Sequence, residues 1–210
     1  MSNKTNLFFR QKQLDFVMTT KSPECYRHID LLFLYHASPV LRLAKPAALI
    51  TVKLNCLNLW LSRKEALCRA TGLKMVEISR RDRSSLFLIY EHCAVKKAIT
   101  SPNAVQILKN YGCSCGESPE GFIEHLKIRF HEEDFPHEIG IFLGYPPEDV
   151  TGFIENNGQK STCCRYWKAY GDAEKAREIW GKIDEAHRLA LEVIHKRLPI
   201  HVAANILKAV

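Results

Sequence analysis

The sequence predicts an α+β fold: a mainly helical single domain with a small, mostly antiparallel sheet. Apolar residues recur at the spacing of an amphipathic helix along most of the chain. Two short apolar runs near the middle are separated by a charged turn, a pattern typical of a hairpin. With 210 residues, 46% of them hydrophobic and 25% charged, the chain has ordinary globular composition. It can bury a core without disulfides or a metal.

The expected sheet comes from three extended segments. Residues 48–54 contain a β-branched run after Pro46, which favours a strand. Residues 73–78 and 86–90 form the hairpin, and the arginine-rich turn between them is expected to be solvated rather than bound to phosphate. Residues 166–170 alternate well enough to predict a further short strand.

Helix boundaries follow from start and stop signals. Serine or aspartate precedes a first turn, proline opens it, and glycine or proline follows the last turn. Asp172 is expected to cap the longest helix, and Pro39 to stop the first one. These signals predict helices over residues 25–36, 57–71, 95–99, 102–111, 119–130, 136–143, 147–157 and 173–198.

The same patterns set the expected domain boundaries. Residues 1–22 are polar and weakly patterned, so we expect a loose N-terminal arm. Residues 23–198 carry the periodic segments and form the single α+β domain. Pro199 breaks the last helix and leaves residues 199–210 as a C-terminal tail.

The charge balance does not predict nucleic-acid binding. Lys and Arg outnumber Asp and Glu by 30 to 23, a net charge of +7, but the positive residues are scattered. The segments 136–143 and 147–157 have the spacing of a helix-turn-helix motif, yet the second starts with Glu148 and Asp149 and contains no Lys or Arg. Carboxylates there would face the phosphate backbone, so we expect no specific DNA binding. No apolar run is long enough to span a membrane, so we expect no membrane association.

The eight cysteines are expected to be reduced thiols. Residues 1–21 are polar and basic, without the apolar core of a secretory leader, which favours a cytoplasmic protein. The close cysteine pairs, 113 with 115 and 163 with 164, depart from the spacing of a zinc site. The identity of any metal or cofactor therefore stays unassigned.

Two long motifs carry a resemblance to a known family. The segment from Phe135 to Phe153, FPHEIGIFLGYPPEDVTGF, is followed by CRYWKAY from Cys164 to Tyr170. Together with YHASP from Tyr35 and the later Lys45, these motifs resemble a bacterial family catalogued as domain of unknown function 3793. The likeness runs from about residue 29 to 185, and it departs from the family pattern at position 165, where we expect glycine and find arginine. The resemblance implies no particular activity.

The family motifs contain the candidate catalytic residues His137, Glu138 and Cys164. A zinc protease would need a second histidine four residues after His137, but position 141 is isoleucine, so that class is excluded. A cation beside Cys164 would favour its thiolate, and a histidine within reach would accept its proton. The alternatives are structural: Glu138 stabilises a helix start, and Cys164 is a buried thiol.

The same motifs supply the candidate ligand-binding residues. His28 and His36 lie two turns apart on one helix face and could ligate iron or haem, but a histidine is also favoured at a helix C-terminus. Other polar and aromatic residues of the motifs complete the candidate set. The ligand-binding candidates are His36, Lys45, Tyr145, Trp167 and Lys168.

Two functions remain open at this point. The first is a small cytosolic protein with a metal or thiol site, enzyme or not, that holds His137, Glu138 and Cys164 in one pocket. The second is a non-catalytic regulatory module whose motif residues are structural and which binds a small molecule or a protein. We expect the helix that starts at Pro136 to pack on the strand 166–170 through an apolar face. That face consists of Phe135, Ile139, Phe142 and Leu143.

Overall fold

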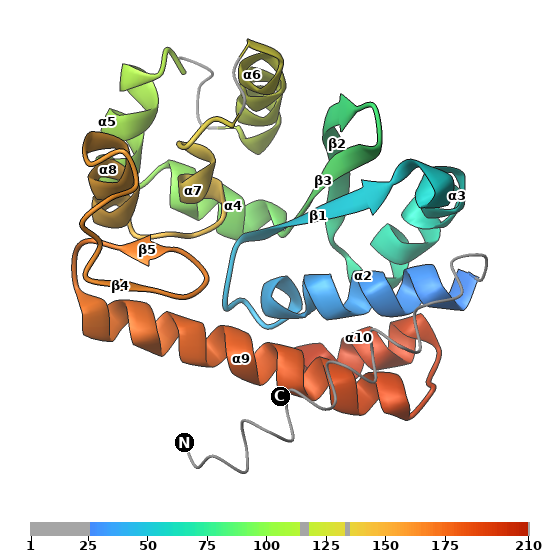
Figure 1. Ribbon diagram of the computed structural model, residues 1–210. Helices are drawn as coiled ribbons and strands as arrows, with labels where there is room; N and C mark the ends of the chain where they lie inside the picture. Colours follow the sequence, from blue (N-terminus) through green and yellow to red (C-terminus); the bar gives the residue numbers. More distant parts are fainter. Residues whose placement is uncertain (1–25, 114–117, 133–134, 210) are drawn as a thin grey trace.

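The computed structural model describes residues 26–113, 118–132 and 135–209. The arm expected at residues 1–22 lies outside these ranges, as do Cys25 and Cys115. The described residues form the mainly helical α+β domain that the sequence predicts (Figure 1).

A three-stranded antiparallel sheet lies at the centre of the fold. Strands β1 (Ala47–Lys53), β2 (Lys74–Arg81) and β3 (Ser84–Tyr90) pair in the order β1-β3-β2, so the middle strand is the last in sequence. Successive residues of β3 alternate between two apolar cores: Phe87 and Ile89 face one, Leu88 and Tyr90 the other. Because both faces are buried, the sheet separates two layers of helices.

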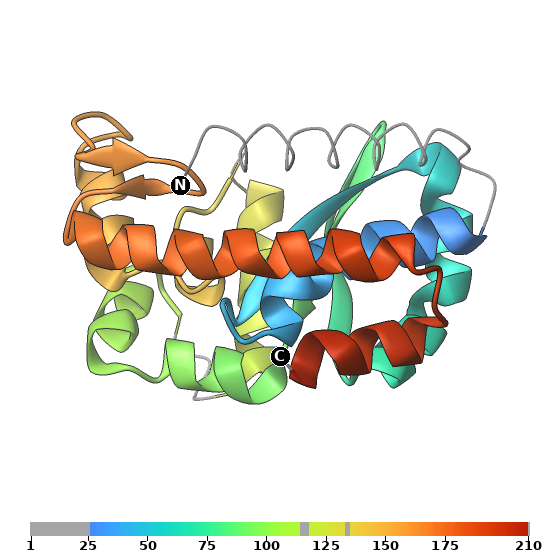
Figure 2. The same ribbon diagram turned by 90° about the horizontal axis from the view of Figure 1, so that it is seen from below.

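One layer contains α2 (Tyr26–Leu41), α3 (Leu54–Thr71), α9 (Ala173–His195) and α10 (Ile200–Ala209). Figure 2 shows the long α9 running across the molecule beside α2 and α10. We expected a tail at residues 199–210, but Ile200–Ala209 form helix α10. Its Ala203, Ala204 and Leu207 are buried in this core. Its apolar residues have helical spacing, so one face of this short helix packs against α2, α3 and α9.

Pro39 does not stop α2, which continues to Leu41. A proline inside a helix leaves the carbonyl four residues earlier without its backbone donor. Here that carbonyl belongs to Tyr35, and the Ser38 hydroxyl donates to it at 2.8 Å. The side chain next to the proline thus satisfies the acceptor that the proline leaves open, and the helix runs on for another two residues.

The second layer packs on the other face of the sheet. It contains α4 (His92–Ile99), α5 (Pro102–Asn110), α6 (Pro119–Glu132), α7 (Ile139–Phe142) and α8 (Pro147–Glu155). The helix expected over 136–143 is thus only the short α7. The expected first turn of the helix is instead a hydrogen-bonded turn at residues 137–138. The Glu138 side chain makes no cap there and pairs with Arg129 of α6.

A small hairpin joins the second layer to α9. Strands β4 (Cys163–Cys164) and β5 (Lys168–Ala169) pair antiparallel, and Trp167 packs against Trp180 of α9. The strand expected over 166–170 is therefore shorter than predicted. It ends early because the backbone N–H groups of Tyr170 and Gly171 donate to Asp149 of α8, not to a neighbouring strand.

Candidate functional site

A cavity of about 320 Å³ lies between the segment 135–153 and the β4–β5 hairpin. Its lining is mostly apolar and aromatic, with basic side chains and one thiol added by the hairpin. The lining residues are Leu49, Phe135, His137, Ile139, Gly140, Leu143, Tyr145, Asp149, Val150, Phe153, Cys164, Arg165, Tyr166, Trp167 and Lys168.

Most of the residues singled out in the sequence meet in this cavity. His137, Tyr145, Cys164, Trp167 and Lys168 all line it. Both family motifs therefore contribute walls of the cavity, although they are separate segments of the chain. The expected packing of 135–143 on the hairpin occurs in part: Ile139 and Leu143 line the cavity with Trp167, but Phe142 packs on Phe122 of α6, with ring centroids 4.3 Å apart.

Asp149 fixes the geometry of the hairpin wall. Its carboxylate accepts from Trp167 Nε1 at 2.7 Å, from the Tyr170 backbone at 2.7 Å and from the Gly171 backbone at 2.8 Å. Asp149 is 2% exposed; its bond with Trp167 is buried and its two backbone bonds are partly buried, and an ionised acceptor makes stronger hydrogen bonds than a neutral one. The sequence indicated only a helix-start acid here, because the three donors lie about twenty residues further along the chain.

Aromatic rings form the floor of the cavity. Tyr145 stacks on Trp167 with centroids 4.7 Å apart and an interplanar angle of 23°. Burial raises the pKa of Tyr145 to about 12, so its phenol is neutral at physiological pH. The preceding Gly144 has φ 76°, and a Cβ there would lie 2.4 Å from Cδ of Pro46. Only glycine fits this close turn, which directs Tyr145 toward the hairpin.

The cavity mouth carries the thiol and the basic groups. Cys164 is exposed and pairs with Lys168 across the hairpin. Lys168 Nζ donates to the Gly158 carbonyl at 2.5 Å, and Arg165 Nη2 donates to Asp184 Oδ1 at 2.8 Å. His137 is exposed, and its ring packs edge-on against the Phe153 ring with centroids 4.9 Å apart. Arg165 is thus paired with an acid, whereas no ion pair of the described residues includes the Lys168 ammonium group.

Glu138 is directed away from this cavity. Its carboxylate is 1% exposed and accepts from Arg129 Nε at 2.9 Å, and it is not among the lining residues. The side chain ties the 135–138 turn to α6 and so holds the neighbouring His137 over Phe153. Glu138 is therefore part of the packing between the turn and α6, outside the cavity.

His36 and Lys45 meet in a second cluster, together with His187 of α9, which sequence reasoning missed. Tyr35 stacks on His187 with centroids 4.6 Å apart. Lys45 Nζ lies 5.5 Å from the centre of the Tyr145 ring, so this cluster contacts the cavity floor. Burial lowers the pKa of His36 to about 4 and that of Lys45 to about 8. Burial and then the charges of His36 and Lys45 lower the pKa of His187 to about 3.

Acid is expected to destabilise the fold through these two histidines. In the unfolded chain both histidines have the ordinary pKa of 6.5. In the folded protein the pKa of His36 is about 4 and that of His187 is about 3, so both imidazoles stay neutral well below pH 6.5. Their contribution to the free energy of unfolding is therefore complete above pH 6.5 and falls as the pH drops toward 4. Urea midpoints from pH 7 to pH 4 are expected to fall more steeply for wild type than for the His36→Gln, His187→Gln double variant. If the urea midpoints of the two proteins fell equally with pH, this expectation would be wrong.

Among the described residues, no group of three or more His, Cys, Asp or Glu side chains could hold a metal ion. The cysteines at 56, 68, 93, 163 and 164 are free thiols. None of the described helices has the length and apolar character needed to cross a membrane.

The family comparison agrees with the motifs that build the cavity. A family model described as "Protein of unknown function (DUF3793)" matches residues 33–202, which include both cavity walls and the second cluster. No curated protein and no solved structure matches the chain. Because the family model covers most of the sequence, the chain belongs to the DUF3793 family.

Proposed function

We propose that the cavity binds a small organic anion with a flat apolar body, and that Cys164 is the reactive thiol of this site. The observation that carries the proposal is the convergence of a thiol, an imidazole and two cationic side chains on one aromatic-lined cavity. A volume of about 320 Å³ falls at the small end of the range for small-molecule sites, about 300–1,000 Å³. The ligand is therefore a single small molecule rather than a peptide.

The apolar and the basic side chains of the lining indicate a ligand with a flat apolar body and an acidic group. Leu143, Phe153 and Trp167 offer apolar surface for the flat body. Arg165 and Lys168 offer charged donors for the acidic group. The Asp149 carboxylate is held by its three N–H donors and Asp184 pairs with Arg165, so Lys168 is the cation of the lining that no ion pair of the described residues includes.

Within this proposal Cys164 is the nucleophile, because a thiol attacks an electrophile as the thiolate. No hydrogen bond of the described residues joins Cys164 to His137, so His137 accepts the thiol proton through one water molecule or after the ligand has bound. Both residues line the cavity and both are exposed, so a bound ligand would reach them. Glu138 keeps the His137 turn in place through Arg129. The second candidate function is a regulatory module that binds the same ligand without chemistry. The open, exposed position of Cys164 favours it, since reactive intermediates are usually enclosed.

Protection of Cys164 from alkylation tests the proposal. Anilinonaphthalene sulfonate carries flat rings and an acidic group, and N-phenyl-1-naphthylamine carries the same rings without the charge. The sulfonate is expected to slow iodoacetamide modification of Cys164, measured by peptide mass spectrometry, more than the neutral amine does. Cys93, an exposed thiol on α4, is the internal control and is expected to react at an unchanged rate.

Lys168→Met is expected to weaken protection by the sulfonate about fivefold, the effect of an ion pair of about 1 kcal/mol at a partly exposed site. Protection by the neutral amine should not change. Lys182→Met, which removes an exposed lysine on α9, is the matched control. Equal protection of Cys93 and Cys164, or none at Cys164, would refute the binding site. Protection without any covalent adduct from electrophilic organic acids would favour the regulatory module.

A further inference from the structure

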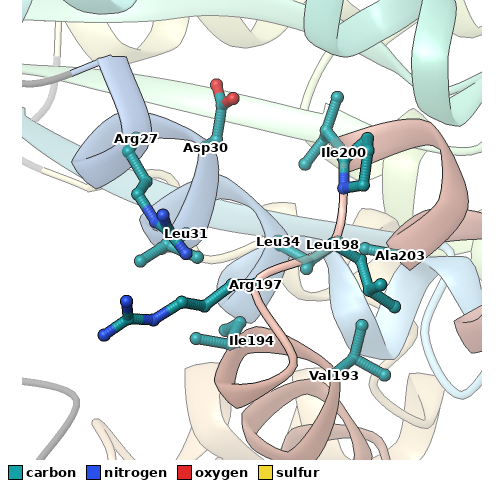
Figure 3. Close-up of a pocket in the computed structure, with 11 residues that line it drawn as sticks. Arg27, Asp30, Leu31, Leu34, Val193, Ile194, Arg197, Leu198, Ile200 and Ala203 are labelled. Atoms are coloured by element: carbon teal, nitrogen blue, oxygen red, sulfur yellow. The ribbon is translucent and has the colours of Figure 1, made fainter.

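A second cavity, of about 270 Å³, lies toward the C-terminal end of α9, between α2, α9 and α10 (Figure 3). It shares no lining residue with the first cavity, which contacts the hairpin near the start of α9. Its walls are mainly aliphatic. The apolar lining residues are Leu31, Leu34, Val193, Ile194, Leu198, Pro199, Ile200 and Ala203.

Two arginines flank this apolar cavity. Arg27 comes from α2 and Arg197 from the link between α9 and α10, and Figure 3 shows both guanidinium groups on the same side of the cavity. Both are exposed, and the hydrogen bonds, ion pairs and ring contacts of the described residues include neither side chain. The acid in the lining, Asp30, points away from both and accepts from Arg63 Nε at 2.8 Å and Nη2 at 2.6 Å. The positive charge at the mouth is therefore not neutralised by the described part of the fold.

The backbone at Arg197 is strained. Its φ of 56° lies in the left-handed region just beyond the end of α9, a position where glycine is the usual residue. An arginine accepts this conformation at an energetic cost, and its side chain makes no described contact that stabilises the fold. A backbone outlier of this kind often belongs to a ligand site, where the side chain is used for binding.

We propose that this cavity binds a free single-chain organic acid, with the carboxylate between Arg27 and Arg197 and the alkyl chain against the aliphatic walls. A guanidinium matches a carboxylate in both charge and shape, and two of them at one mouth select an anion over a neutral head group. Leu31 and Ile194 lie beside the two arginines and offer the first aliphatic surface to the alkyl chain (Figure 3). The ligand differs from that of the first cavity, whose lining is aromatic.

Calorimetric titration with decanoate, below its micelle concentration, tests this site. Saturable binding of one decanoate is expected, about tenfold tighter than binding of decanol, which has the same chain without the charge. Arg27→Met is expected to weaken decanoate about tenfold and leave decanol unchanged. Arg177→Met, which removes an exposed arginine on α9 outside the cavity, is the matched control.

Arg197→Gly gives a readout that a purely structural role would not produce. It relieves the left-handed strain, so the urea midpoint is expected to rise while decanoate affinity falls about tenfold. The proposal is overturned if decanoate shows no saturable binding, if decanoate and decanol bind equally, or if both arginine variants bind decanoate as tightly as wild type. Arginine-dependent binding to phosphatidylglycerol vesicles without binding of free decanoate would also overturn it and would indicate a lipid surface.

Discussion

Replacing Asp149 with alanine is expected to lower the free energy of unfolding by about 4 kcal/mol, because three donors lose one buried anionic acceptor. A hydrogen bond to a charged group contributes about 1.5–3 kcal/mol, and the two partly buried backbone donors regain part of this from water. The donors are Trp167 Nε1 and the backbone N–H groups of Tyr170 and Gly171. The wall that carries Cys164 and Lys168 would lose its anchor to α8. Urea unfolding followed by circular dichroism measures the change.

Glu148→Gln is the matched control for this variant. Glu148 is the neighbouring acid on α8, its side chain is 42% exposed, and its ion pair with Lys175 is 3.5 Å long. Its replacement is expected to change stability by less than about 0.5 kcal/mol. If Asp149→Ala cost no more than Glu148→Gln, the carboxylate would not be the anchor of the hairpin.

Glu138→Ala is expected to cost about 3 kcal/mol, the lower end of the range for removing one partner of a buried ion pair. The Glu138 side chain is 1% exposed and that of Arg129 is 17% exposed, so water replaces the lost contact poorly. The variant should also reduce protection of Cys164 by the sulfonate probe, since it frees the turn that carries His137. Chemical denaturation and the alkylation assay measure the two effects.

An exposed pair on the same helix provides the comparison. Glu124 and Lys127 of α6 form an ion pair at 2.6 Å, with side chains 67% and 33% exposed. Glu124→Ala is expected to cost less than about 1 kcal/mol, as for other exposed pairs. Similar losses for Glu124→Ala and Glu138→Ala would mean that the buried pair has no special role in the fold.

The elements predicted correctly are those with local signals. Asp172 caps α9 by accepting from the backbone of Glu174 and Lys175 at 2.9 and 3.1 Å, and Gly72 ends α3 at φ 71°. The apolar run at residues 86–90 predicted the strand β3 of a hairpin, although it did not show that β3 is the central strand. Such features depend on residues only a few positions apart, which a sequence displays directly.

The features that were missed depend on distant residues. Pro39 is tolerated through the Ser38 hydroxyl, and α10 is a helix because the core accepts its apolar face. The role of Asp149 depends on donors in the hairpin, and His187 joins His36 only because α9 crosses α2. No local pattern distinguishes these residues from a first-turn acid or a surface histidine.

The sequence singled out some of the residues that line the cavity but not the shape of the cavity. The family motifs identified His137, Tyr145, Cys164, Trp167 and Lys168, which line one cavity. They also identified Glu138, whose adjacent position in the chain does not bring it to the same surface. In the turn at residues 137–138 the His137 side chain is exposed and the Glu138 side chain is buried. The helix start predicted at Pro136 did not indicate this difference.

The most direct test of the central claim compares an anionic and a neutral alkylating reagent at Cys164. If the cavity mouth attracts organic anions to a reactive thiol, the rate ratio of iodoacetate to iodoacetamide should be higher at Cys164 than at the same thiol in Lys168→Met. The ratio at Cys93 should be the same in both proteins. An unchanged ratio at Cys164 would contradict the account, because the basic side chains would then have no influence on what reaches the thiol.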